Sequence, residues 1–274
     1  MVAETGVTRQ DMLHLQDLML MQQARLHDLS DKAGRKQSAL ALQGLFLALQ
    51  TALEPDFTLE IGAHSANFSQ DMARRGIPAH AFEANPYNYT AFAPDIRQHA
   101  PGVHYHHMAI SDEDGEATFR IRLDDQGQAL RRLGSNSLLA RDDPDTQYET
   151  VTVPASRLDS FLQRHALGGH SFSAWIDVEG ALGKVTAGFG SALQSCLSLI
   201  VEVEEKRYWQ GQMLVREVMD YLDAQGLVPV ARDFEYLRQY NMIYLRKDML
   251  ALKGVRSALV GYFAASHGVA EPPG

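Results

Sequence analysis

The sequence predicts an α/β fold whose central sheet is mostly parallel. From Phe57 onward, short apolar runs alternate with segments of helical periodicity, which is typical of strands connected through helices. The residues between Ser198 and Glu202 are continuously apolar, as expected for a central strand covered on both faces. Only residues 234–240 separate the last two expected strands, and so short a connection requires an antiparallel pair.

Two helices are expected before the first strand. Apolar residues recur at spacings of three and four from Thr8 to about Ser30, and Thr8 is a suitable N-cap. A second helix over about residues 37–53 ends before Pro55, because a residue that precedes proline avoids helical geometry. The first helix is rich in methionine, so we expect it to pack on the core or to form a homodimer contact.

The remaining elements follow from the same patterns. We expect strands at residues 58–61, 79–83, 104–108, 118–123, 150–154, 174–178, 197–202, 228–233 and 241–246. We expect helices at residues 67–75, 86–98, 157–164, 184–189 and 211–225. The chain then divides into an N-terminal helical extension (1–55), one large domain (56–266) and a flexible tail (267–274).

Composition narrows the range of functions. The 274 residues carry a net charge of −9, which argues against non-specific nucleic-acid binding because such binding depends on neutralising phosphates. The single cysteine, Cys196, cannot form an intrachain disulfide. No apolar run is long enough to span a membrane, and no signal-peptide pattern is present, so we expect a cytoplasmic protein.

Polar and acidic residues follow almost every expected strand of the sheet. In open α/β sheets, ligands bind outside the carboxyl ends of the strands, so these residues are the candidates for a site. They are Glu60-Ile-Gly62-Ala-His64, Glu83-Ala-Asn85-Pro86, Ala109-Ile-Ser111-Asp112, Asp177-Val-Glu179-Gly180 and Glu202-Val-Glu204-Glu205.

The first of these segments predicts a nucleoside site. Gly62 allows a tight turn, and free N–H groups at the helix entry near His64 and Ser65 attract an anion such as a carboxylate. The second glycine of a dinucleotide fingerprint is absent, so a ligand without a pyrophosphate fits better. Glu83 ends the next strand and suits a bond to ribose hydroxyls.

Five ordered motifs over about residues 57–246 resemble the FkbM family of S-adenosylmethionine-dependent methyltransferases. The turn resembles the family pattern Asp-Val-Gly-Ala-Asn-x-Gly-x-Tyr-Ser. The other four motifs are Phe82-Glu-Ala-Asn-Pro-Tyr-Asn88, Ala109-Ile-Ser-Asp-Glu-Asp-Gly115, the Arg-Leu-Asp segment at 157–159 and Trp175-Ile-Asp-Val-Glu-Gly180. The resemblance implies a Rossmann-like class I methyltransferase fold, with a mostly parallel seven-stranded sheet and one antiparallel strand near the C-terminal end.

Five departures from the family pattern bear on the site. Glu60 stands where the family has aspartate, His64 where it has asparagine and Ala66 where it has glycine. Trp175 replaces a lysine, and Leu182 replaces a glutamate. We therefore expect the cofactor pocket to differ most from its relatives at the turn.

The resemblance also implies roles for individual residues. Glu60, Gly62 and Ala63 are expected at the methionine end of S-adenosylmethionine, with His64 and Ala84 beside the cofactor. Glu83 is expected to hold the ribose hydroxyls, Ser111 and Asp112 to lie near the adenine, and Asp177 to lie where the methionine amine meets the acceptor. Asp177 alternatively serves as a helix N-cap.

Transfer to a hydroxyl requires a base, because the acceptor must lose its proton. The candidates are Asp177, Glu179, Glu202 and His64, and the sequence does not rank them. A divalent cation that lowers the pKa of the hydroxyl is a less favoured alternative, so no metal ligand is assigned. His104 and His106 share one face of a strand, but a third ligand is not evident.

The expected acceptor is a hydroxyl of a sugar, a glycan or a natural-product scaffold. We expect the long insertion over residues 124–147 to form a lid, with Asn136 and Ser137 touching the acceptor; an ordinary surface loop is the alternative. Tyr208 and Trp209 are expected to form an aromatic wall or a core anchor. Two other functions stay open: a non-catalytic S-adenosylmethionine-binding protein, and a nicotinamide oxidoreductase, against which the missing glycine and the reversed strand argue.

Overall fold

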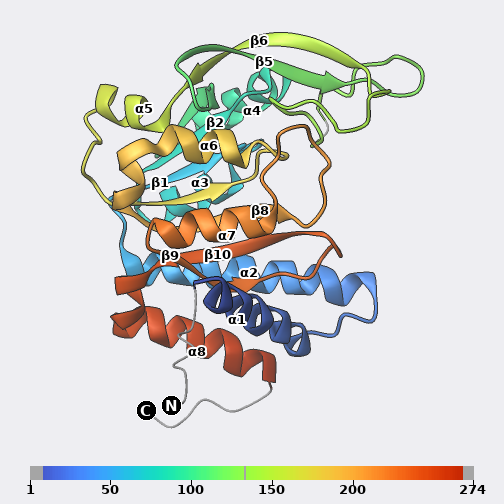
Figure 1. Cartoon of the computed structure of the whole chain (residues 1–274). Coiled ribbons are helices and arrows are strands. Elements are labelled where there is room, and N and C mark those ends of the chain that lie inside the picture. Colours follow the sequence, from blue (N-terminus) through green and yellow to red (C-terminus); the bar gives the residue numbers. More distant parts are fainter. Residues whose placement is uncertain (1–8, 133, 268–274) are drawn as a thin grey trace, which may run out of the picture.

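A seven-stranded sheet forms the centre of the molecule (Figure 1). The computed structural model describes residues 9–132 and 134–267. The strand order is β3-β2-β1-β7-β8-β10-β9, and only β10 runs antiparallel to its neighbours. The strands are β1 (Phe57–Ile61), β2 (Ala79–Glu83), β3 (Val103–His107), β7 (Phe172–Ile176), β8 (Cys196–Glu204), β9 (Leu227–Arg232) and β10 (Gln239–Arg246). The predicted sheet, with its one reversed strand, is confirmed.

The strand order reverses between β1 and β7. From β1 the chain continues outward to β2 and β3, and it later returns to pair β7 with the other side of β1. A crevice opens at such a switch point because the connections leave its two strands in opposite directions. The segments that follow Ile61 and Ile176 therefore lie at the position where a ligand is expected.

Helices cover both faces of the sheet. The core of one face includes apolar side chains of α5 (Leu158–Arg164), α6 (Leu182–Phe189) and α7 (Val215–Ala224). The core of the other face includes side chains of α2 (Lys32–Leu53), α3 (Asn67–Arg74) and α8 (Lys253–His267). α4 (Pro86–His99) packs beside β2 and β3. The N-terminal α2 is thus a structural layer of the sheet domain.

Four helices differ clearly from the sequence expectation. The first helix, α1 (Arg9–Gln22), continues only as a 3-10 turn to Leu26 instead of reaching about Ser30, and α7 begins at Val215 instead of residue 211. α2 begins at Lys32, five residues before the expected start, because the Asp31 carboxylate accepts a 2.7 Å hydrogen bond from the Gly34 N–H and caps the helix. α8 was not predicted, since Gly254 and Gly261 weaken its helical signal. Gly254 is useful in the folded chain, because a Cβ there would lie 3.1 Å from the Ala52 Cβ of α2.

A second, three-stranded sheet covers one end of the large sheet (Figure 1). Its order is β4-β6-β5, formed by Ala109–Ile110, Tyr148–Ser156 and Gly115–Arg122 respectively. Residues 123–147 connect β5 to β6 and make an isolated bridge between Arg141 and Trp209, which follows β8. The insertion is thereby fixed to the large domain beside the ends of the parallel strands.

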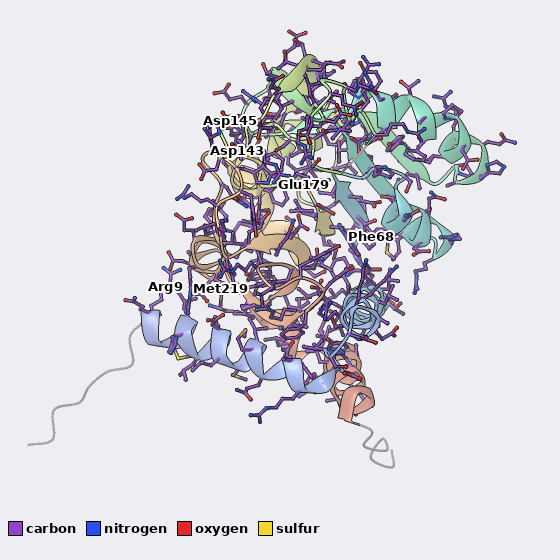
Figure 2. All side chains as sticks on the ribbon, turned by 90° about the vertical axis from the view of Figure 1, so that its right-hand side faces the viewer. Arg9, Phe68, Asp143, Asp145, Glu179 and Met219 are labelled. Carbon is purple, nitrogen blue, oxygen red and sulfur yellow. The ribbon has the colours of Figure 1, made fainter. Side chains whose placement is uncertain are left out.

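The first helix lies across the opposite end of the molecule from Asp143 and Asp145 of the insertion (Figure 2). α1 spans Arg9–Gln22 and continues as a 3-10 turn over Gln23–Leu26, while Thr8, the expected cap, lies outside the described residues. Five apolar side chains of α1 are at least 46% exposed: Met12, Leu15, Leu18, Met19 and Met21. The homodimer through this helix stays a prediction. Within the described residues, no helix has the length and apolarity needed to cross a membrane.

Histidines from neighbouring strands form a stack on one face of the sheet. The rings of His80 and His104 lie 4.7 Å apart, and His80 Nδ1 lies 3.2 Å from His106 Nε2. Burial, reinforced by the neighbouring histidines, lowers the pKa of His80 to about 3 and that of His106 to about 4. His80 and His106 are therefore neutral in the folded protein at physiological pH.

We predict that this stack destabilises the protein in acid. Unfolded histidine titrates near its ordinary pKa of 6.5, so below pH 6.5 the unfolded chain binds protons that the folded chain does not, and the free energy of unfolding falls toward pH 4. His80→Leu should therefore lose less melting temperature than wild type between pH 6.5 and 4.5, measured by circular dichroism. His14→Gln, at an exposed position of α1, should keep the wild-type profile; equal losses for all three proteins would contradict the prediction.

Candidate functional site

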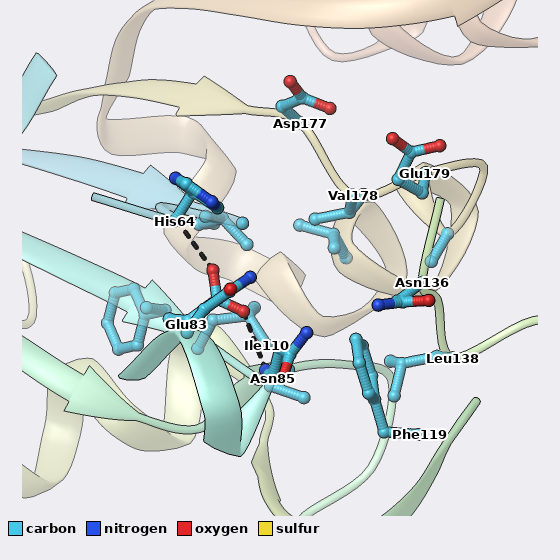
Figure 3. A pocket seen from close by; sticks show the side chains of 18 of the residues that line it. His64, Glu83, Asn85, Ile110, Phe119, Asn136, Leu138, Asp177, Val178 and Glu179 are labelled. Atoms are coloured by element: carbon cyan, nitrogen blue, oxygen red, sulfur yellow. Dashed lines mark hydrogen bonds between the residues drawn. The ribbon is translucent and has the colours of Figure 1, made fainter. Parts of the chain in front are cut away.

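A cavity lies at the carboxyl ends of β1, β2 and β7 (Figure 3). It encloses about 960 Å³ of empty space, including its open mouth, which suits a nucleoside-sized ligand. One wall is polar and includes His64, Glu83, Asn85, Asp177 and Glu179. The other wall is apolar and contains side chains that the sequence reasoning missed, namely Ile110, Phe119, Leu138, Met108 and Val185. An adenine ring needs such a wall, but these residues come from elements that only the fold brings together.

The glycine turn begins where β1 ends. The N–H groups of Gly62 and Ala63 both donate to the Phe82 carbonyl, at 3.0 and 2.9 Å, and tie the turn to β2. Gly62 has a φ of +81°, and a Cβ on it would lie 1.7 Å from the Asp177 carbonyl oxygen. The glycine is therefore required by the approach of β7, in addition to any ligand.

Two further residues of the turn adopt left-handed backbone geometry. The φ of His64 is +44° and that of Ala66 is +55°. Glycine and asparagine adopt this conformation most readily, which gives a physical reason for the family pattern at these two positions. The Tyr105 hydroxyl donates to the His64 carbonyl, and the His64 ring lies 4.7 Å from the Phe92 ring. These contacts hold a turn that lacks the favoured residues.

Glu60 supports the turn from below. Its carboxylate accepts hydrogen bonds from the Phe68 and Ser69 N–H groups, at 3.3 and 2.7 Å, and so caps the start of α3. Burial raises its pKa to about 7. Its side chain does not line the cavity, so its predicted contact with the cofactor stays a prediction.

Glu83 lines the cavity and orders its rim (Figure 3). Its two carboxylate oxygens accept from the His64 N–H at 2.6 Å and from the Asn85 N–H at 2.7 Å. Burial raises its pKa to about 7. The carboxylate thus joins the turn after β1 to the start of α4, and each oxygen keeps a further lone pair for a hydroxyl donor.

The other predicted cofactor residues do not all line the cavity. Ala84 lines the cavity together with Gly62, whereas Ala63 is buried behind it. Ser111 and Asp112 line a neighbouring hollow, where Lys184 Nζ pairs with the Asp112 carboxylate at 2.9 Å. The apolar residues Ala109 and Ile110, just before Ser111, face the cavity instead.

Three of the four candidate bases come together. One oxygen each of Asp177, Glu179 and Glu202 lies within 4.8 Å of the others, and we call these residues the carboxylate trio. Asp177 faces the open cavity, yet the surrounding protein displaces enough water to raise its pKa. Burial and the Asp177 charge raise the pKa of Glu179 to about 8 and also raise that of Glu202. His64 lies beside Glu83, on the other side of the cavity in Figure 3.

The trio lies between the cavity and an adjoining groove. Asp177 lines the cavity, Glu202 lines the groove, and Glu179 lines both. The groove is also lined by Gly134, Ser135, Arg141, Tyr208, Trp209, Tyr236 and Gln239. A methyl group that passes from the cavity to the groove would therefore pass beside these carboxylates.

The insertion holds Glu179 in an unusual backbone conformation. Glu179 has a φ of +49°, and its carbonyl accepts a 2.8 Å hydrogen bond from the Ser137 hydroxyl. Such strain is concentrated at functional sites, where the surrounding structure enforces it. Two residues of the insertion were predicted to contact the methyl acceptor. Asn136 lines the cavity, whereas Ser137 is buried and uses its hydroxyl to support Glu179.

Trp209 mainly serves as an anchor. It is 1% exposed, and the Arg141 guanidinium lies 3.9 Å from its ring centroid. Gly180 lies against the same indole, since a Cβ there would come within 2.2 Å of Trp209 Cδ1. Tyr208 is half-buried on the groove. The indole thus fixes Arg141 and the segment after Glu179 on either side of the groove.

Comparison with known proteins identifies the family. Residues 60–229 match the methyltransferase FkbM domain. The chain belongs to the FkbM methyltransferase family. This FkbM methyltransferase uses S-adenosylmethionine as its methyl donor, as the sequence motifs predict.

Other relatives of this FkbM methyltransferase are distant. It is 24% identical to the 2-O-methyltransferase NoeI of Sinorhizobium fredii, over 77% of this chain and 88% of that protein. Two solved structures are similar at low identity. The 1,6-didemethyltoxoflavin-N1-methyltransferase of Burkholderia thailandensis is 14% identical (TM-score 0.40), over 90% of this chain and 94% of that one. The magnesium protoporphyrin IX methyltransferase of Synechocystis is 10% identical (TM-score 0.42), over 77% and 79%.

The electrostatics of the site fit this cofactor. S-adenosylmethionine carries a sulfonium and an ammonium, and Glu83, Asp177 and Glu179 line the cavity with three carboxyl groups. Each has a raised pKa, because burial disfavours the charged form. A cationic ligand would stabilise the ionised carboxylates, so the cavity is complementary to a positively charged cofactor.

We predict that the close approach at Gly62 cannot be relaxed. Gly62→Ala should lower the free energy of unfolding by more than about 3 kcal/mol, because it combines left-handed strain with a backbone clash. Gly76→Ala is the matched control, since its φ of +80° is similar and its Cβ would meet open space. Left-handed strain alone should cost Gly76→Ala about 1–2 kcal/mol. Urea denaturation measures both, and equal losses would show that the clash is not significant.

Proposed function

We propose that this protein transfers a methyl group to a hydroxyl of a sugar or sugar-like acceptor. The observation that supports this most directly is the position of the carboxylate trio between the cofactor cavity and the polar groove. The trio provides a proton acceptor where an acceptor hydroxyl would meet the methyl group. The NoeI relative is named a 2-O-methyltransferase, which agrees with transfer to oxygen.

The residues of the cavity would hold S-adenosylmethionine in one orientation. Glu83 would accept hydrogen bonds from the ribose hydroxyls, while Ile110, Phe119 and Leu138 would cover the adenine. Asp177 would face the charged methionine end. When bound, the sulfonium supplies an electrophilic methyl group that needs no further activation. The main contribution of the protein is then alignment of the acceptor oxygen with the methyl carbon.

Asp177 is the member of the trio that we assign as the base. Asp177 lines the cavity that would hold the cofactor, whereas Glu202 lines only the groove and Glu179 lines both. Asp177 is also the most exposed of the three, so it is the carboxylate of the trio that is open to an acceptor hydroxyl on the cavity side. It would accept the hydroxyl proton as the oxygen attacks, and the neutral thioether would leave from the cavity.

The groove favours a polyhydroxylated acceptor. Arg141, Tyr208 and Gln239 supply donors and acceptors along it, and Tyr236 is 61% exposed at its edge. Such a surface can bind several hydroxyl groups and one apolar sugar face.

A transfer assay tests the proposed acceptor class. We expect protein supplied with radiolabelled S-adenosylmethionine to methylate members of a panel of oligosaccharides and nucleotide sugars, with no transfer to matched amines or carboxylic acids. Mass spectrometry of the product should place the methyl group on a sugar oxygen. Transfer to nitrogen alone would overturn the proposal. Tight cofactor binding by calorimetry with no transfer to the panel would favour a non-catalytic cofactor-binding role.

We predict that Asp177→Asn lowers kcat about 100-fold or more, because a positioned base contributes at least this much. Asparagine keeps the size of the side chain but cannot accept the proton. Asp145→Asn, in the insertion outside the cavity and the groove, is the control for net charge. If Asp177→Asn keeps the wild-type kcat, another group is the base.

A further inference from the structure

The carboxylate trio has little compensating positive charge. Among the described residues, no lysine, arginine or histidine forms an ion pair with Asp177, Glu179 or Glu202. The positive charge of Arg141 acts on Glu179 without forming an ion pair, and the Arg141 guanidinium lies over the Trp209 ring. Three carboxylates within 4.8 Å repel one another unless a cation or protons lie between them.

Two buried carboxylate oxygens, one in the trio and one next to it, lack hydrogen-bond partners among the described residues. Glu202 Oε2 is buried and has no hydrogen-bond partner among the described residues, although Gln239 on β10 contacts the same carboxylate. Glu204, two residues further along the same face of β8, is 3% exposed. Its Oε1 has no hydrogen-bond partner in the part of the chain that the structure describes, although Gln212 contacts the same carboxylate. Buried carboxylate oxygens are normally paired, so the orphan oxygen of Glu202, which belongs to the trio, indicates a missing ligand there.

The ligand type follows from the donor set. All the donors are carboxylate oxygens, and they come from two adjacent strand ends, after β7 and at the end of β8. Hard divalent cations such as Mg²⁺ and Mn²⁺ prefer this set, and they usually retain water positions that a substrate oxygen can take. Zinc is less suitable, because neither histidine nor cysteine belongs to the group.

We propose that Asp177, Glu179 and Glu202 bind one divalent cation, of the Mg²⁺ or Mn²⁺ class, at the boundary between the cofactor cavity and the groove. Each residue supplies one carboxylate oxygen. Glu204 lies behind Glu202 and adds negative charge to the site. The sequence reasoning did not favour a metal, because it could not show that these three side chains meet.

The consequence for catalysis rests on the proposed function. An acceptor hydroxyl bound to the cation would have a lowered pKa, and a second, neighbouring hydroxyl could occupy another position on the cation. The second oxygen of Asp177 would take the proton as the S–CH₃ bond breaks and the O–CH₃ bond forms. An acceptor with two adjacent hydroxyls would therefore be preferred over one with a single hydroxyl.

Manganese binding tests the site without any acceptor. Metal-free full-length protein, with and without S-adenosylhomocysteine, is titrated with Mn²⁺, and the electron paramagnetic resonance signal of free Mn²⁺ is recorded. We expect one bound Mn²⁺ per chain, displaced by Mg²⁺. Glu202→Gln and Glu179→Gln should each raise the Mn²⁺ Kd by at least about tenfold. Glu113→Gln, exposed and outside both the cavity and the groove, should leave that Kd at the wild-type value.

The outcomes separate this proposal from the proposed function. Absence of Mn²⁺ binding to wild type that still binds S-adenosylhomocysteine would overturn the cation site and leave methyl transfer standing. Mn²⁺ binding that both trio variants retain would also overturn it. Conversely, a trio-dependent Mn²⁺ site in a protein that methylates no sugar would support the cation site and count against the acceptor. Circular dichroism of the variants confirms that they are folded.

Discussion

The close approach of the glycine turn to the end of β7 is the constraint on which the rest of the site depends. Gly62 passes so near the Asp177 carbonyl that no side chain fits between them, and the Asp177 N–H donates to the Ile61 carbonyl at 2.9 Å. The two strands on either side of the switch point are therefore fixed together. The turn that follows β1 and the Asp177 side chain that follows β7 consequently face one cavity.

Carboxylates connect this framework to the chemistry. Glu60 caps α3 and Glu83 joins the turn to α4, so both are used to build the rim of the cavity. The trio lies on the far side, where the insertion holds Glu179 through Ser137. Burial disfavours the charged form and raises the pKa of Glu60 and Glu83 to about 7 and that of Glu179 to about 8. Positive charge from a ligand would shift the balance toward carboxylate.

Local sequence signals predicted much of the framework. Strand and helix periodicity gave nearly all elements of the large sheet, and the short loop before β10 predicted the reversed strand. They did not give the extent of α2, which depends on the Asp31 cap, or α8, in which Gly254 packs against α2. For Ser111 and Asp112, the motif indicated the correct strand end but not the direction of the side chains, which point to a neighbouring hollow.

The sequence by itself determined the fold class, the family and the residues at each strand end, because these depend on short-range periodicity and on motifs of a few residues. Tertiary structure alone decided which of those residues meet. Asp177 and Glu202 are separated by 24 intervening residues, and they come together because β7 and β8 are paired in parallel with their carboxyl ends at one edge. His64 was an equal candidate in the sequence, and the fold places it beside Glu83, apart from the trio.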